Sequence, residues 1–157
     1  MAKKNYSLEA SQLIQEHTMY SLGSGLIPVV GLDIMANTAI QMELTRKLCT
    51  LYHLKYKEAQ LRSLLNALVG STAARIYAMG TKSLLKLIPG VGTMVGGVVV
   101  GLYAAASTYA SGEVFKLHIE AGGTLNDFDA KAMQKYYKIK LDEGLKIIEK
   151  WKKERGE

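Results

Sequence analysis

An apolar corner that occurs twice constrains the fold more than any other feature of this chain. Leu26-Ile27-Pro28-x-Val30-Gly31 recurs as Leu87-Ile88-Pro89-x-Val91-Gly92. Proline disfavours helix before itself and suits the first turn of the next helix, and glycine permits a tight reversal. We therefore predict two helix–corner–helix units, at about 8–54 and 60–118. The residues expected to shape the corners are Pro28, Gly31, Asp33, Pro89, Gly90 and Gly92.

The rest of the chain also favours helices. No stretch sustains the apolar–polar alternation that marks a half-buried strand. Gly122-Gly123 predicts a helix end, and a charged amphipathic helix is expected over about 124–155. A length of 157 residues suits one domain. We expect an all-α fold over 1–157: a helical bundle of two duplicated apolar helical hairpins followed by the charged C-terminal helix.

The second unit contains a long segment without charge, from Leu87 to Gly112. A helix of about 20 apolar residues is long enough to cross a bilayer. However, the segment opens with the corner and is rich in glycine, alanine and hydroxyl side chains, which makes insertion marginal. The apolar corners are therefore expected either to be buried or to enter a membrane.

Small residues in this segment recur at helical spacing, and they are Gly96, Gly97, Gly101 and Ala105. Such spacing lets two helices approach closely, in lipid or in water. It favours self-association of the chain and is equally compatible with a tight helix pair inside one chain.

A polar line follows the first corner, with Asp33, Asn37, Gln41 and Thr45 spaced four residues apart. One interpretation is an interior track that binds a ligand. The other is that Asp33 caps the helix after Gly31 and that the remaining residues form an ordinary hydrophilic face.

The charge of the chain, +6 at pH 7, is concentrated near its end. Residues 131–157 contain nine basic and five acidic side chains beside an apolar stripe. A basic amphipathic helix of this kind either lies on an anionic membrane or packs its stripe on its own domain. The candidates for membrane contact are Lys146, Lys150, Trp151, Lys152 and Lys153.

The sequence offers little catalytic or metal chemistry. The three histidines are isolated, and the pair Asp127/Asp129 is expected to cap a helix rather than hold a cation. Cys49 is expected to pack, and neither glycine-rich segment meets the pattern of a phosphate-binding loop. We expect no enzyme, metal or cofactor, and nucleic acid is an unlikely partner because only the charge favours it.

Several motifs together resemble the bacterial YcjF-like family of unknown function. They are Leu26-Ile27-Pro28 with Gly31-x-Asp33 and Thr38-Ala39-Ile40-Gln41, then Ile88-Pro89-Gly90-Val91-Gly92-Thr93, then Tyr109-Ala110-x-Gly112, and finally His118-x-Glu120-x-Gly122-Gly123-Thr124-Leu125-x-Asp127-Phe128. The resemblance implies a helical, membrane-associated domain that often accompanies a small GTPase. For this chain a GTPase would be a separate partner.

Three functions remain open from the sequence. The first is a membrane-associated, self-assembling scaffold, shaping element or anchor on the cytoplasmic side of a bacterial inner membrane. The second is a soluble cytoplasmic homo-oligomer that binds proteins. The third, weaker hypothesis is a small ligand-binding protein or enzyme that uses Asp33, Asn37, Gln41 and His118. One cysteine and no apolar stretch directly after the basic N-terminus favour a cytoplasmic location without a signal peptide.

Overall fold

The computed structural model describes residues 5–24, 32–78 and 96–156, with side chains over 5–23, 37–70 and 101–156. Within these ranges the regular structure is helical, which confirms the prediction of an all-α bundle. The helices are α1 (Tyr6–Ser24), α2 (Leu32–Leu51), α3 (Glu58–Ala78), α5 (Gly96–Glu120) and α6 (Ala130–Arg155). Pro28, Gly31, Pro89, Gly90 and Gly92 lie outside the described residues, and the proposed duplication of the two units stays a prediction.

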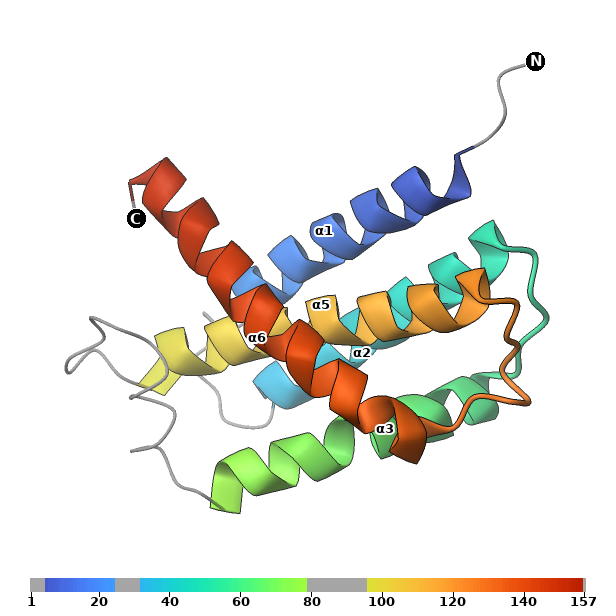
Figure 1. The fold of residues 1–157 in the computed structure, drawn as a ribbon. Helices are drawn as coiled ribbons and strands as arrows, with labels where there is room; N and C mark the ends of the chain where they lie inside the picture. Colours follow the sequence, from blue (N-terminus) through green and yellow to red (C-terminus); the bar gives the residue numbers. More distant parts are fainter. Residues whose placement is uncertain (1–4, 25–31, 79–95, 157) are drawn as a thin grey trace.

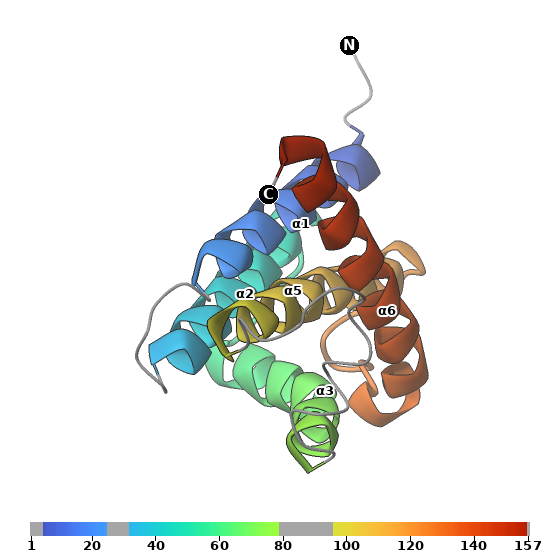
Figure 2. The same ribbon diagram turned by 90° about the vertical axis from the view of Figure 1, so that its left-hand side faces the viewer.

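Helix α5 occupies the middle of the bundle. It packs against α1, α2, α3 and α6, and Figure 2 shows these four helices around it. Helix α6 crosses the outer side of α5 diagonally and also contacts α3 (Figure 1). A central helix must bury its whole circumference, and this explains why α5 carries no charge until Glu113.

Small side chains on α5 let its neighbours come close, and larger ones fill the core around them. Ala105, Ala106 and Ala110 are completely buried, as is Phe115 one turn further along. Burying a leucine- or phenylalanine-sized side chain contributes about 1.5–3 kcal/mol. The large buried residues from the other helices are Ile14, Met42, Leu44, Leu48, Leu61, Leu65, Leu68, Tyr137 and Ile148.

The end of α5 follows the glycine signal in the sequence. Gly122 adopts a positive φ of 88°, its N–H donates to the carbonyl of Ile119, and the N–H of Gly123 donates to the carbonyl of His118. This is the paired hydrogen-bond pattern with which a left-handed residue closes a helix. The predicted helix end at Gly122-Gly123 is therefore confirmed.

Helix α6 begins at Ala130, later than the predicted start near 124. Asp129 is its N-cap, and the Asp129 carboxylate accepts the backbone N–H bonds of Lys131 and Ala132 at 3.0 Å each. Residues 124–129 instead form a loop that reverses the chain between α5 and α6. The predicted helix-capping role is therefore confirmed for Asp129, whereas Asp127 accepts hydrogen bonds from Thr124 within the loop.

Candidate functional site

A layer of hydroxyl and amide side chains lies inside the bundle where α1, α2, α5 and α6 meet. The Thr108 Oγ1 donates to Asn37 Oδ1 at 3.1 Å and lies 2.6 Å from Ser21 Oγ. Either hydroxyl can donate in the shorter bond. Ser21 and Thr108 are both completely buried.

The adjacent residue of α5, Ser107, connects α2 and α6. Gln41 Nε2 donates to Ser107 Oγ at 2.9 Å, and Ser107 Oγ lies 2.8 Å from the Tyr137 hydroxyl. Gln41 is 3% exposed and Tyr137 is 0% exposed. Burial raises the pKa of Tyr137 to about 12, so the phenol stays neutral at physiological pH. We call Ser21, Asn37, Gln41, Ser107, Thr108 and Tyr137 the polar layer.

The polar layer decides between the two interpretations of the line that follows the first corner. Gln41 and Thr45 are buried, and Thr45 donates to the carbonyl of Gln41 at 2.8 Å. The ordinary hydrophilic face is therefore wrong for these two residues. Asp33 lies in the first turn of α2, and its side chain is outside the described residues.

The ligand-binding combination proposed from the sequence does not form in the described residues. Asn37 contacts Thr108, whereas His118 lies ten residues further along α5, about 15 Å at the usual helical rise. The partners of His118 are in the loop that follows α5. The polar layer contains no charged side chain and no nucleophile–base pair. Its hydrogen bonds join the helices of the bundle to one another.

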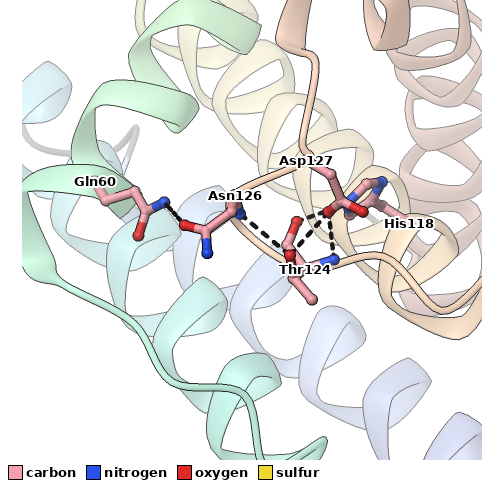
Figure 3. A network of polar contacts seen from close by, with 5 residues as sticks. All are labelled: Gln60, His118, Thr124, Asn126 and Asp127. Carbon is pink, nitrogen blue, oxygen red and sulfur yellow. Dashed lines mark hydrogen bonds and ion pairs between the residues drawn. The ribbon is translucent and has the colours of Figure 1, made fainter.

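The loop between α5 and α6 contains the last motif of the family resemblance, and its residues hold one another. Asp127 Oδ1 accepts from the Thr124 N–H at 2.6 Å, from the Thr124 hydroxyl at 3.0 Å, and lies 3.2 Å from His118 Nε2 (Figure 3). The Thr124 bonds hold the pKa of Asp127 below its usual value. Gln60 of α3 donates to Asn126 at 2.9 Å, which ties the loop to the bundle.

The same loop explains two further residues of the motif. A Cβ added to Gly123 would overlap the His118 ring, so any larger residue there would require the ring to shift. The Phe128 ring stacks on Phe115 with centroids 4.5 Å apart and meets the edge of His118 at 5.0 Å. We interpret the motif as the structural element that closes α5 and starts α6.

Helix α6 turns its apolar stripe inward. Tyr137, Leu141 and Ile148 are buried, and Trp151 packs partly buried against the core. Of the side chains predicted for membrane contact, Lys146, Lys150 and Lys153 are exposed and Lys152 is half-buried. The contact of these five side chains with a membrane stays a prediction.

The small residues on α5 that the structure describes face the interior of their own chain. Gly101 and Ala105 are buried, which matches the internal helix pair that the spacing also allowed. The side-chain surroundings of Gly96 and Gly97 are outside the described residues. The sequence analysis did not single out Gly144 of α6, where a Cβ would lie 3.2 Å from the Ala106 Cα and 2.9 Å from Tyr109 Cδ1. Its position on the stripe, between Leu141 and Ile148, was the available signal.

Metal-ligating side chains do not gather in groups of three or more anywhere in the described part of the chain. Cys49 is fully buried, and desolvation raises its pKa to about 11. The thiol is therefore protonated at neutral pH and poorly suited to nucleophilic chemistry.

Crossing a bilayer requires a helix that is both long and apolar. None of the described helices combines the length and the hydropathy of a membrane span. The first part of the charge-free segment, up to residue 95, is outside the described residues.

Comparison with known proteins assigns the chain to a family. Residues 2–143 match the family described as "Domain of unknown function (DUF697)", so the chain belongs to it. The narrower resemblance to the YcjF-like family stays a prediction. Across 146 residues the chain is 36% identical to a protein named Magnetosome membrane protein 22, from Magnetospirillum gryphiswaldense strain MSR-1, and the match covers 92% of this chain and 75% of that protein. No solved structure is significantly similar.

Proposed function

We propose that this chain is a membrane-associated helical domain with a non-catalytic role, serving as a self-assembling scaffold, shaping element or anchor. One observation carries the proposal: a relative that is 36% identical over nearly the whole chain bears the name of a membrane protein. A GTPase as a separate partner is what the YcjF-like resemblance implies.

The charge distribution supports an anionic membrane as the partner. The chain carries a net charge of +6, and exposed lysines stand along the outside of α6. The cytoplasmic leaflet is the negative face of a membrane, and each basic residue near it contributes about 1 kcal/mol. We therefore propose the cytoplasmic face of the bacterial inner membrane as the location.

Fractionation tests the proposal directly. Cells that express the chain are lysed, membranes are washed with carbonate, and the purified protein is floated with vesicles of phosphatidylcholine alone or mixed with phosphatidylserine. We expect the chain in the membrane fraction and flotation that depends on the anionic lipid. Protein that stays in the soluble fraction and ignores both vesicles would refute a membrane role.

A second candidate is a soluble homo-oligomer that binds proteins. The inward packing of the α6 stripe favours it, because the described helices bury their apolar side without lipid. With Gly101 and Ala105 buried, assembly would use outer surfaces, such as the exposed Leu8 and Tyr20 of α1. Light scattering on protein purified without detergent separates this candidate: a defined oligomer with no vesicle binding supports it.

A further inference from the structure

The lysines of α6 differ in whether an acidic side chain pairs with them, and in the first half Lys140 Nζ lies 2.7 Å from Glu143 Oε2. Lys131, Lys135 and Lys138 are exposed, and none of them forms an ion pair with any residue that the structure describes. Their spacing of four and three residues places them on one side of the helix. The positive charges of these three lysines are therefore not paired within the described part of the protein.

In the second half, Lys150 and Lys153 have acidic partners, whereas the exposed Lys146 has none among the described residues. Lys153 Nζ lies 3.0 Å from Glu149 Oε1, and Lys150 Nζ lies 3.9 Å from Glu154 Oε1. Trp151, which could have anchored this half in an interface, packs against the core instead. The positive potential of the second half is correspondingly reduced.

An exposed apolar side chain stands beside the unpaired lysines. Ile139 is 48% exposed and follows Lys135 by one helical turn. Lys131 also occupies the first turn of α6, which contains no acidic residue. A cation there opposes the helix dipole, so this lysine does not serve helix stability.

We propose that Lys131, Lys135, Lys138 and Ile139, together the lysine face, form the surface through which the protein contacts anionic phospholipid headgroups. The lysines pair with the headgroups while Ile139 enters the interfacial layer. This inference rests on the proposed membrane association and names its contact surface.

Two observations favour lipid over an acidic protein as the occupant. Ile139 is the one large apolar side chain exposed on the described part of α6, whereas protein interfaces have an extended apolar or aromatic centre. A bilayer, by contrast, offers mobile negative charges that match solvated lysines without a fixed partner geometry. Helix α6, which carries the face, crosses the outer side of α5 (Figure 1).

Two triple variants with the same loss of charge test the proposal. The first carries Lys131→Gln, Lys135→Gln and Lys138→Gln, and the second carries Lys146→Gln, Lys150→Gln and Lys153→Gln. Glutamine preserves helix propensity, so both should fold, which circular dichroism checks. Sedimentation with vesicles of phosphatidylcholine and phosphatidylserine measures the apparent Kd. We expect a loss of roughly a hundredfold for the first triple, from the usual contribution of each lysine, and less than about tenfold for the second.

The outcomes distinguish failure of the proposed membrane association from failure of the lysine face. Wild-type protein that does not bind the anionic vesicles refutes the proposed function and the lysine face together. If the wild type binds but the second triple loses as much affinity as the first, the lysine face is wrong while membrane association stands. A first triple that binds vesicles like the wild type would assign these lysines to another partner, such as an acidic protein.

A single substitution tests the apolar part of the face. Ile139→Gln should weaken vesicle binding by about threefold or more, since it removes a side chain of the size that partitions into the interface. The matched control is Leu117→Gln, an exposed apolar residue of α5 outside the face, which should leave binding unchanged. Equal effects of the two substitutions would refute the entry of Ile139 into the interface.

Discussion

Helices α5 and α6 cross each other and have similar lengths, but they distribute polarity in opposite ways. In α5 the polar groups are hydroxyls, and Ser107 and Thr108 point into the bundle, where other side chains satisfy them. In α6 the polar groups are charges on the outside, while one apolar stripe faces α5. A charge-free segment can therefore reflect a central position in a bundle, whereas a helix with one side in solvent carries its charges on that side.

The contrast between the two helices predicts the largest loss of stability at Phe115, a buried residue near the end of α5. Phe115 is completely buried and stacks on Phe128, so Phe115→Ala should lower the free energy of unfolding by about 3–5 kcal/mol. Leu117, two residues away on the same helix, is 43% exposed, and Leu117→Ala should cost about 0.5 kcal/mol or less. Urea denaturation followed by circular dichroism measures both. Similar losses would show that α5 is not the buried centre.

The next prediction concerns the crossing of the two helices. A Cβ at Gly144 would lie 3.2 Å from the Cα and 3.3 Å from the O of Ala106, and backbone atoms cannot move aside cheaply. Gly144→Ala should therefore destabilise the protein by about 1–3 kcal/mol, even though alanine is the better helix former.

Gly70 in α3 supplies the matched control, because an added Cβ there meets nothing within 4 Å. Gly70→Ala should stabilise the protein by about 0.5–1 kcal/mol through helix propensity alone. The two substitutions are chemically identical, so opposite signs isolate the contact with Ala106. Stabilisation by both would mean that α6 lies further from α5 than the distances indicate.

The polar layer predicts a smaller effect at the same crossing. Tyr137→Phe removes the hydroxyl that meets Ser107 Oγ at 2.8 Å and should cost about 1–2 kcal/mol. Tyr136 is the neighbouring residue and is only half-buried, so Tyr136→Phe should change stability by less than about 0.5 kcal/mol. If Ser107→Ala and Tyr137→Phe prove fully additive in the double variant, the two hydroxyls are not coupled.

The sequence predicts where helices form better than it predicts what covers them. The glycine pair at 122–123 ends α5 as expected. The amphipathic period predicts that α6 exists but not its start, which lies at Ala130 rather than near 124. Periodicity predicts an apolar stripe but not the surface against which the stripe packs. It therefore left open whether Trp151 contacts lipid or the core. The inward turn of Gln41 was equally hidden, because its partner Ser107 lies 66 residues away along the chain.

The loop after α5 predicts the smallest effect, a dependence of stability on pH. Hydrogen bonds from Thr124 lower the pKa of Asp127 in the folded protein. A carboxyl whose folded pKa is depressed contributes stability above its unfolded pKa, and this contribution is lost as the pH falls through the folded value. Asp127→Asn should therefore be less stable than the wild type at neutral pH, and the difference should vanish toward strongly acidic pH. Denaturation midpoints of both proteins across the acidic range measure this convergence. A constant difference would mean that the ionised carboxylate of Asp127 does not hold the loop that joins the central helix to the charged one.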